Sequence, residues 1–303
     1  MRVLVTNDDG VLAPGLGALT RALAAWAQAS AAEGGPRHEI VVVAPSSNYS
    51  GAGAAVGSVD EHTTIAYQRA KVEGAEHIEA YGLDASPALS VIAGALGAVG
   101  PKPDLVISGI NHGVNVGRSV LHSGTVGAAL TASQLGISAL AVSLRAGVTP
   151  DPWESAADLA VSLIPVLAAA PVRTVLNLNV PALPLSEILG LRWARVSGAG
   201  LIKAAVGDGS WDSPNTPEME GPAAAEGAKS VMGGGTIVLT VGTPFPHSGD
   251  AGLADSSEDA ALVAQGYAAL TALRGPRADD DAALLEQLDA GLAAVLAPLG
   301  LSN

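Results

Sequence analysis

The chain contains no cysteine and few basic residues, and each shortage excludes a class of protein. Without cysteine there is no disulfide, no thiol catalyst and no cysteine-ligated zinc or iron–sulfur site, so any metal needs oxygen or histidine ligands. Lysine and arginine number 15 against 29 aspartate and glutamate residues, which gives a formal net charge of −14. That balance argues against a nucleic-acid polymer, which is gripped through its phosphates. A small phosphate can still bind locally, through a cation or a helix N-terminus.

Long uninterrupted hydrophobic runs are also missing, although 49% of the residues are hydrophobic. The longest apolar stretches, 85–99 and 127–144, carry Ser, Thr, Gln or Gly throughout. A membrane span needs about 20 apolar residues. The N-terminus enters a strand-like segment directly, without a basic and then apolar leader. We therefore expect no membrane partner and a cytoplasmic location.

Predicted strands and helices alternate over the first 180 residues. Short apolar segments predict five buried strands: 2–6, 40–43, 104–107, 139–144 and 174–179. The segments between them predict four helices: 16–32, 87–96, 124–135 and 153–167. Alternation of this kind predicts an α/β fold, with a Rossmann-like, doubly wound and mainly parallel sheet covered by helices on both faces.

The last third of the chain has a different composition. Residues 201–235 are rich in Gly, Pro, Ser and acids, which predicts a long loop or a hairpin excursion, and a strand follows at 236–240. Two Ala-rich patterns predict further helices: 257–273 and 279–296. We expect a core over residues 1–200 and a C-terminal hairpin and helix appendage over 201–303 that contributes to oligomerisation. Docking of the last helix on its own core is the alternative.

Two adjacent carboxylates, Asp8 and Asp9, directly follow the first predicted strand, at a turn that Gly10 permits. Two carboxylates about 4 Å apart repel by roughly 4 kcal/mol at an effective dielectric of 20, and a divalent cation reverses that cost. Ser50 and Asn111 follow two other predicted parallel strands, at the carboxyl edge where ligands of open α/β sheets bind. Carboxylate, amide and hydroxyl oxygens suit Mg²⁺ or Mn²⁺. Turn-forming acids in a solvated loop are the alternative.

A glycine-rich loop over residues 108–117 leads towards a helix that opens at Ser123, Gly124 and Thr125. Backbone N–H groups and the helix dipole attract an anion there, and Ser123, Thr125 and Asn115 add donors without negative charge. The pattern predicts a phosphate-binding site. The alternative is a glycine-rich connection with an ordinary N-cap.

Five motifs resemble the survival protein SurE family in order and spacing. They are Val5-Thr6-Asn7-Asp8-Asp9-Gly10, Val43-Ala44-Pro45 with Ser50, Ser108-Gly109-Ile110-Asn111-His112-Gly113 with Asn115, Ser123-Gly124-Thr125-Val126, and Leu176-Asn177-Leu178-Asn179-Val180-Pro181. A looser resemblance over 255–267 covers the acidic run and Gly-Tyr pair that precede the family's last strand. The resemblance implies a metallophosphatase that hydrolyses nucleoside 5′- and 3′-monophosphates and forms a homodimer or homotetramer.

The same resemblance implies roles for individual residues. One divalent ion, Mg²⁺ or Mn²⁺, would be held by Asp8, Asp9, Ser50 and Asn111. The phosphate would face Asn115, Ser123, Gly124 and Thr125. Asp8 or Asp9 would also deprotonate the attacking water, and an aspartyl-phosphate intermediate is the mechanistic alternative.

The chain departs from the family pattern at Ser46–Tyr49, His112 and Arg118. These changes leave the implied metal ligands intact and bear on substrate preference and turnover. A catalytically silent nucleotide- or phosphate-binding regulatory protein is therefore the alternative function. His112 and His122 flank the glycine-rich loop as candidate proton donors or as structural residues. The glycines near Ser50 lack the spacing of a dinucleotide-binding fingerprint, which argues against NAD.

Overall fold

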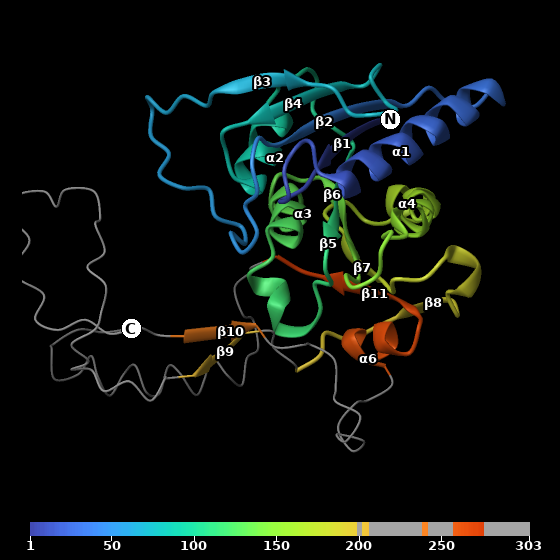
Figure 1. The fold of residues 1–303 in the computed structure, drawn as a ribbon. Helices are drawn as coiled ribbons and strands as arrows, with labels where there is room; N and C mark the ends of the chain where they lie inside the picture. Colours follow the sequence, from blue (N-terminus) through green and yellow to red (C-terminus); the bar gives the residue numbers. More distant parts are fainter. Residues whose placement is uncertain (199–201, 206–237, 242–256, 276–303) are drawn as a thin grey trace, which may run out of the picture. The chain divides into compact units, whose positions relative to one another are not determined.

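The computed structural model describes residues 1–198, 202–205, 238–241 and 257–275, and most of its strands form one sheet. The strands of this sheet are β1 (Arg2–Thr6), β2 (Glu39–Pro45), β3 (Tyr67–Ala70), β4 (Glu79–Leu83), β5 (Leu105–His112), β6 (Ser138–Leu144), β7 (Val175–Val180), β8 (Leu191–Trp193) and β11 (Ala268–Leu273). Their order is β3-β4-β2-β1-β5-β6-β7-β11-β8 (Figure 1). Neighbouring strands are parallel except β3 with β4 and β7 with β11. The predicted mainly parallel α/β sheet is confirmed.

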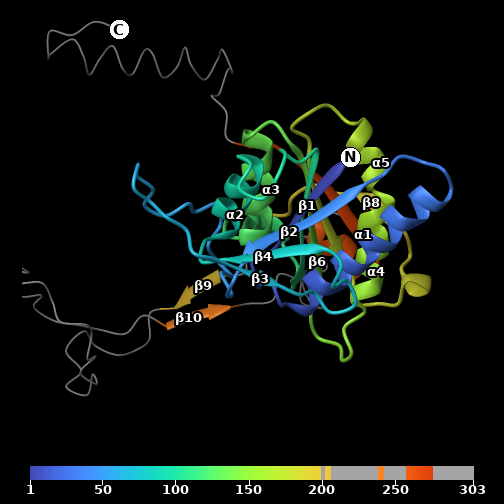
Figure 2. The ribbon, with the colours of Figure 1, turned by 90° about the horizontal axis from the view of Figure 1, so that it is seen from above.

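Helices cover both faces of the sheet (Figures 1 and 2). One face carries α1 (Pro14–Ala32), α4 (Trp153–Ser162) and α5 (Ile164–Ala169), and the other carries α2 (Pro87–Ala95) and α3 (Gly124–Gln134). Successive residues of β1 pack on opposite faces, with Val3 and Val5 in one core and Leu4 in the other. Burial on both faces explains why the strand sequences are continuously apolar.

The strand order reverses between β1 and β5. The chain passes from β1 to β2 and β4 on one side, and then returns to β5 on the other side of β1. The chain therefore leaves the carboxyl ends of β1 and β5 in opposite directions along the same edge of the sheet. Such a switch point is where ligands of open α/β sheets bind.

β5 is longer than its predicted segment, because its pairing with β6 continues to His112. The register changes between Ser108 and Asn111, where β5 contains one extra residue. Gly109 lies in this bulge at a φ of +143°, and a Cβ there would lie 2.4 Å from the carbonyl oxygen of Val142. The prediction that Asn111 lies in a loop after the strand was wrong, because Asn111 lies on the strand itself. The bulge changes the direction of the side chains that follow it.

The helix predicted over 257–273 was wrong in its second half. The structure has a short helix, α6 (Asp259–Ala264), and then β11, which pairs antiparallel with β7. Gly266, at a φ of +93°, separates the two elements. Alanine favours helix in isolation, but pairing in the sheet overrides that weak preference. The strand implied after the Gly-Tyr pair is confirmed.

The predicted hairpin excursion is confirmed in part. β9 (Ile202–Ala205) and β10 (Val238–Val241) form a separate antiparallel sheet. The chain divides into units 1–273 and 274–303, and the helix predicted over 279–296 lies outside the described residues. No helix in the described part of the chain is both long and apolar enough to cross a membrane.

Candidate active site

The acidic pair lies in a tight turn at the carboxyl end of β1. The side chain of Asn7 closes this turn, since its Nδ2 donates to the carbonyl of Gly10 at 2.9 Å and its Oδ1 accepts from the Gly10 N–H at 3.2 Å. Gly10 has a φ of +108°, a conformation that favours glycine. The turn buries Asp8, which is 2% exposed, and leaves Asp9 half-buried.

Both carboxyl groups have raised pKa values, which means that their ionised forms are disfavoured. Burial is the main cause for Asp8, and it outweighs the hydrogen bonds from Thr125 and Gly124 that lower the pKa of this group. Burial is also the main cause for the raised pKa of Asp9, and the charge of Asp8 adds to it. The N–H of His112 donates to Asp9 at 3.3 Å and partly offsets this effect. Among the described residues, no lysine or arginine forms an ion pair with either acid. Within the described part of the chain, the pair therefore has no lysine or arginine partner, and the only charge that lowers the pKa of Asp9 is that of His112.

Thr125 joins the acidic turn to the end of β5. Its Oγ1 donates to Oδ1 of Asp8 at 2.5 Å and lies 3.5 Å from Oδ1 of Asn111. The amide nitrogen of Asn111 donates to the carbonyl of Gly113 at 2.6 Å, which fixes the orientation of the side chain. Two of the predicted metal ligands thus converge on one buried hydroxyl group. Because the single proton of that hydroxyl is donated to Asp8, Thr125 contacts a phosphate through this group only if that hydrogen bond is exchanged.

The loop after β2 is tied to the acidic turn by its backbone. The N–H of Tyr49 donates to the carbonyl of Asp8 at 2.7 Å, and the N–H of Ser50 donates to Oδ1 of Asn48 at 2.7 Å. Ser50 is exposed. The predicted ligand Ser50 is therefore the next residue in the chain after Tyr49, whose N–H contacts the acidic turn.

The donor set of this site fits a hard cation. Within the described residues, no group of three or more His, Cys, Asp or Glu side chains could hold a metal ion. A metal would instead be held by the carboxylates of Asp8 and Asp9 with the hydroxyl of Ser50 and the amide oxygen of Asn111. Oxygen ligands of this kind suit Mg²⁺ or Mn²⁺, and the uncompensated acid pair is the feature that a divalent cation would stabilise.

The N-terminus of α3 approaches Asp8 closely. Ser123 caps the helix, and its Oγ accepts from the N–H of Val126 at 3.1 Å. A Cβ on Gly124 would lie 2.7 Å from the Cβ of Asp8 and 2.8 Å from its Oδ2. Only glycine therefore allows this approach. The positive end of the helix dipole faces the site, as an anion-binding role requires.

Asn115 is held by buried polar side chains from β6 and β7. Its N–H donates to Oδ1 of Asn179 at 2.7 Å, and its carbonyl accepts from Asn177 at 2.9 Å and from Asn179 at 3.1 Å. Its own Nδ2 donates to Oγ of Ser143 at 2.8 Å. An amide nitrogen carries two protons, so one remains for a further acceptor.

A buried carboxylate from α6 holds the segment after Asn115. Asp259 is fully buried, and its carboxylate accepts from the N–H groups of Gly117, Ser197 and Ala260 at 3.0, 3.0 and 2.8 Å. The C-terminal part of the described chain therefore contributes to the position of the glycine-rich loop.

Sequence reasoning did not assign roles to Asn177, Asn179, Ser143 or Asp259. The signal for the two asparagines was present, since they are alternate polar residues in an otherwise apolar, buried strand. A buried polar side chain needs a partner, so such a pair indicates a specific contact. The sequence does not say that the partner is the backbone of Asn115.

The two histidines differ in their surroundings. The Nε2 of His112 lies 3.4 Å from Oδ2 of Asp151, and its ring lies 5.6 Å from that of Trp153. His122 is exposed, and its carbonyl accepts from the N–H of Gly53 at 3.0 Å.

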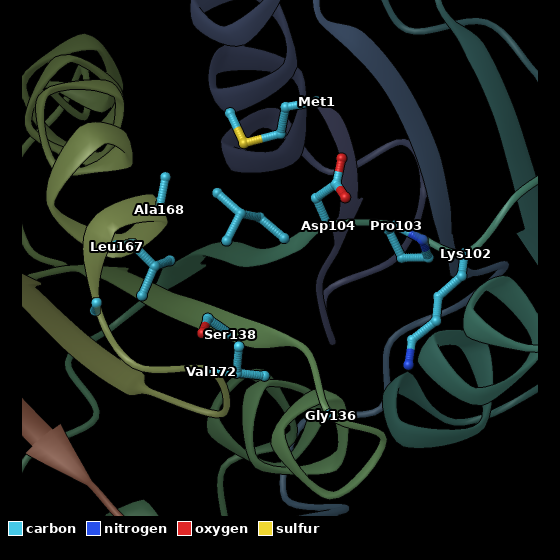
Figure 3. A pocket seen from close by; sticks show the side chains of 11 residues that line it. Met1, Lys102, Pro103, Asp104, Gly136, Ser138, Leu167, Ala168 and Val172 are labelled. Atoms are coloured by element: carbon cyan, nitrogen blue, oxygen red, sulfur yellow. The ribbon is translucent and has the colours of Figure 1, made fainter.

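Two of the grooves in the described part of the chain differ in their distance from the acidic turn. One, of about 450 Å³, is lined by the amino ends of β5 and β6, including Leu105 and Ser138 (Figure 3). It is far along the strands from the acidic turn and lacks the predicted site residues. The other, of about 370 Å³, is lined by Val11 to Pro14, immediately after the acidic turn, and by Trp153.

Comparisons with known proteins agree with this geometry. The family model described as survival protein SurE matches residues 3–201. A 5′/3′-nucleotidase SurE of Cronobacter sakazakii is 39% identical over 197 residues, which are 64% of this chain and 69% of that protein. A 5′-nucleotidase SurE of Aeromonas hydrophila is 38% identical over 65% of this chain and 72% of its own length. The crystal structure of the SurE protein from Aquifex aeolicus superposes with a TM-score of 0.68 at 25% identity, covering 96% of this chain and 99% of that one. The chain therefore belongs to the SurE family.

Proposed function

We propose that this chain is a metal-dependent phosphatase that hydrolyses nucleoside 5′- and 3′-monophosphates to nucleoside and phosphate. The observation that carries the proposal is the uncompensated pair Asp8 and Asp9, joined through Thr125 to the N-terminus of a helix. A divalent cation and a phosphate would each meet complementary groups there. The nucleotidase names of the relatives at 36–39% identity support the same reaction.

One divalent ion, Mg²⁺ or Mn²⁺, held by Asp8, Asp9, Ser50 and Asn111, would polarise the phosphoryl oxygens and lower the pKa of water. Asp8 or Asp9 would accept the proton of the attacking water, and Asp9 is the more accessible of the two because it is half-buried whereas Asp8 is buried. Asp8 is the poorer base, since Thr125 already donates to it in a buried setting. These roles make an aspartyl-phosphate intermediate less favourable, because both acids are committed elsewhere.

The helix N-terminus and Asn115 would hold the phosphate. The start of α3 carries the positive end of the helix dipole, and the N–H groups of Gly124 and Thr125 there also donate to the carboxylate of Asp8. Asn115 would donate its remaining amide proton, and the contacts to Asn177, Asn179 and Ser143 keep it in place before substrate arrives. No observation favours the catalytically silent alternative, since the implied metal ligands are all present.

The proposal extends to assembly and location. A homodimer or homotetramer joined through the region 201–303, and a location in the cytoplasm, follow from the resemblance and from the composition of the chain. Light scattering of the purified chain and fractionation of cells that express it would test these two points.

Release of phosphate from AMP tests the reaction. The native chain should release phosphate with Mn²⁺ or Mg²⁺, lose this activity in a chelator, and regain it when the metal is restored. Asp9→Asn should lose it at all metal concentrations. Asp158→Asn, which neutralises an exposed acid on α4, is the matched control and should behave as the native chain does. Full activity of Asp9→Asn in metal-free buffer would contradict the proposal.

A further inference from the structure

The groove of about 370 Å³ begins where the acidic turn ends. Val11 follows Gly10 in the chain, and its N–H donates to the carbonyl of Pro45 at 2.8 Å, which ties this segment to the end of β2. The groove then runs along α1 as far as Arg21. Its volume is within the range of sites for small ligands. The groove therefore adjoins the acidic turn through Val11 and Leu12, while Asp8 and Asp9 themselves are not among its lining residues.

Two apolar side chains of the groove lie close to the acidic turn, one exposed and one half-buried against the hydrophobic core. Leu12 is 76% exposed and lies in the turn between the buried strand β1 and helix α1. Trp153 is half-buried at the start of α4, and its ring lies 5.6 Å from that of His112. The N–H of His112 donates to Asp9. The indole is therefore separated from the acid pair by a single residue.

The indole of Trp153 packs closely against Gly15 of α1. A Cβ on Gly15 would lie 2.8 Å from Cζ3 of Trp153 and 2.1 Å from the carbonyl oxygen of Ile110. Gly15 is thus the residue that lets the indole and β5 approach α1. A ring held in this way offers a flat surface without the loss of side-chain entropy on binding.

The charge of the groove also differs from that of the whole chain. Its ionisable lining residues are Arg21, Lys71 and Glu73, so basic residues outnumber acidic ones there, in a chain whose formal net charge is −14. Arg21 is held by the carbonyl of Glu73 at 3.1 Å and lies 4.0 Å from Glu154. The neighbouring acid Glu154 offsets part of this basic charge.

We infer that this groove holds the base of the nucleotide, stacked on Trp153 with Leu12 at its edge, while the phosphate lies at Asp8 and Asp9. The inference rests on the proposed function and adds the site for the nucleoside. Stacking on an aromatic ring is available to every base. The groove should therefore accept purine and pyrimidine nucleotides with little discrimination.

A comparison of AMP with ribose 5-phosphate isolates the base, because the two substrates share the sugar and the phosphate. In the native chain, kcat/KM should be higher for AMP. Trp153→Ala should lower the ratio of the two kcat/KM values by between about fivefold and a hundredfold, the range expected for loss of one base-stacking ring. Trp153→Phe should retain most of the ratio. Trp193→Ala, which removes an exposed tryptophan on β8, is the matched control and should leave the ratio unchanged.

A second variant tests the inference in case Trp153→Ala does not fold. Leu12→Ser changes a side chain that is 76% exposed, so it should fold normally and lower the same ratio by a smaller factor. If both variants lower kcat/KM equally for the two substrates, Trp153 and Leu12 support the packing of α1 and α4 only, and the inference fails.

Calorimetry makes the test independent of turnover. AMP should bind the native chain with Mn²⁺ at least about fivefold more tightly than ribose 5-phosphate does, and Trp153→Ala should remove that difference. Equal affinity of the native chain for the two ligands overturns the inference, whether or not it hydrolyses them. Absence of hydrolysis with a preserved difference in affinity contradicts the proposed function alone.

Discussion

Replacing Thr125 by valine tests how the buried hydroxyl controls metal binding. Thr125 is fully buried, and valine has nearly its shape but cannot donate to Asp8. A hydrogen bond to a charged group contributes about 1.5–3 kcal/mol. Because this bond stabilises the ionised carboxylate, its loss should favour protonation of Asp8 by about 10- to 150-fold, at about 1.4 kcal/mol per factor of ten.

The expected result depends on pH in a definite direction. Burial raises the pKa of Asp8 and the Thr125 hydrogen bond lowers it, so Thr125→Val should raise this pKa further. Protons compete with the metal for the carboxylate. The apparent affinity for Mn²⁺ should therefore be weaker in the variant at acidic pH, by up to about 10- to 150-fold, and should approach the native value as the pH rises and Asp8 ionises in both proteins.

The stability of the metal-free chain should also depend on pH, because the pKa of Asp8 is raised in the folded state. A carboxyl group whose pKa is higher in the folded state than in the unfolded state binds more protons when folded. The metal-free chain should thus lose stability as the pH rises from the unfolded pKa of about 3.8 through the raised folded value, and Thr125→Val should extend this loss to higher pH.

Isothermal calorimetry with Mn²⁺ across a pH series, with urea unfolding of the metal-free chain, would measure both effects. Thr125→Ser keeps the hydroxyl and should follow the native curve. Native and Thr125→Val affinity curves that superpose at every pH would refute the reasoning, because they would mean that the hydroxyl does not stabilise the ionised form of Asp8.

Three further changes probe the rest of the site and the C-terminal region. Asn115→Asp should lower kcat/KM for AMP by at least about 100-fold, equivalent to about 2.7 kcal/mol, because it sets a carboxylate against the phosphate. The affinity for Mn²⁺ measured without substrate should hardly weaken. Collapse of Mn²⁺ binding with preserved turnover at saturating metal would mean that Asn115 holds the metal or the fold. Gly124→Ala should reduce the free energy of unfolding by about 1–3 kcal/mol in urea, since its Cβ would lie 2.7 Å from that of Asp8, and native stability would show that α3 can move away. Truncation before Asp279 should reduce the mass measured by light scattering, and a folded truncated chain of unchanged assembly would exclude this segment from the interface.

The strands and helices around the site could be predicted because their patterns are local. Short apolar segments and helical spacing predicted β1, β2, β6 and β7 and the helices α1 to α3 within a few residues. The single helix predicted over 153–167 is divided in the structure into α4 and α5. The short strands β3, β4 and β8 had no such pattern, and β11 looked helical because of its alanines. A short segment becomes a strand through hydrogen bonds to a neighbour that is distant in sequence, and composition does not contain that information.

The chemistry of the site could also be predicted from the sequence. Asp8 and Asp9 next to Gly10, Ser50 after a strand, and a glycine-rich loop before Ser123 indicated an oxygen-rich site for a metal and a phosphate at one edge of the sheet. These features depend on residue type and on the order of the strands alone. The sequence therefore predicted the kind of site and its place in the fold.

Only the tertiary structure decided which of these side chains are in contact and what they do to one another. Thr125 was predicted to face the phosphate, and in the structure its hydroxyl donates to Asp8. Asn115 is held by Asn177 and Asn179, which follow it by more than 60 residues. The raised pKa values of the acid pair arise from burial by elements far apart in the chain. Hydrogen bonding and desolvation depend on distances of a few ångströms between such elements, and packing alone sets those distances.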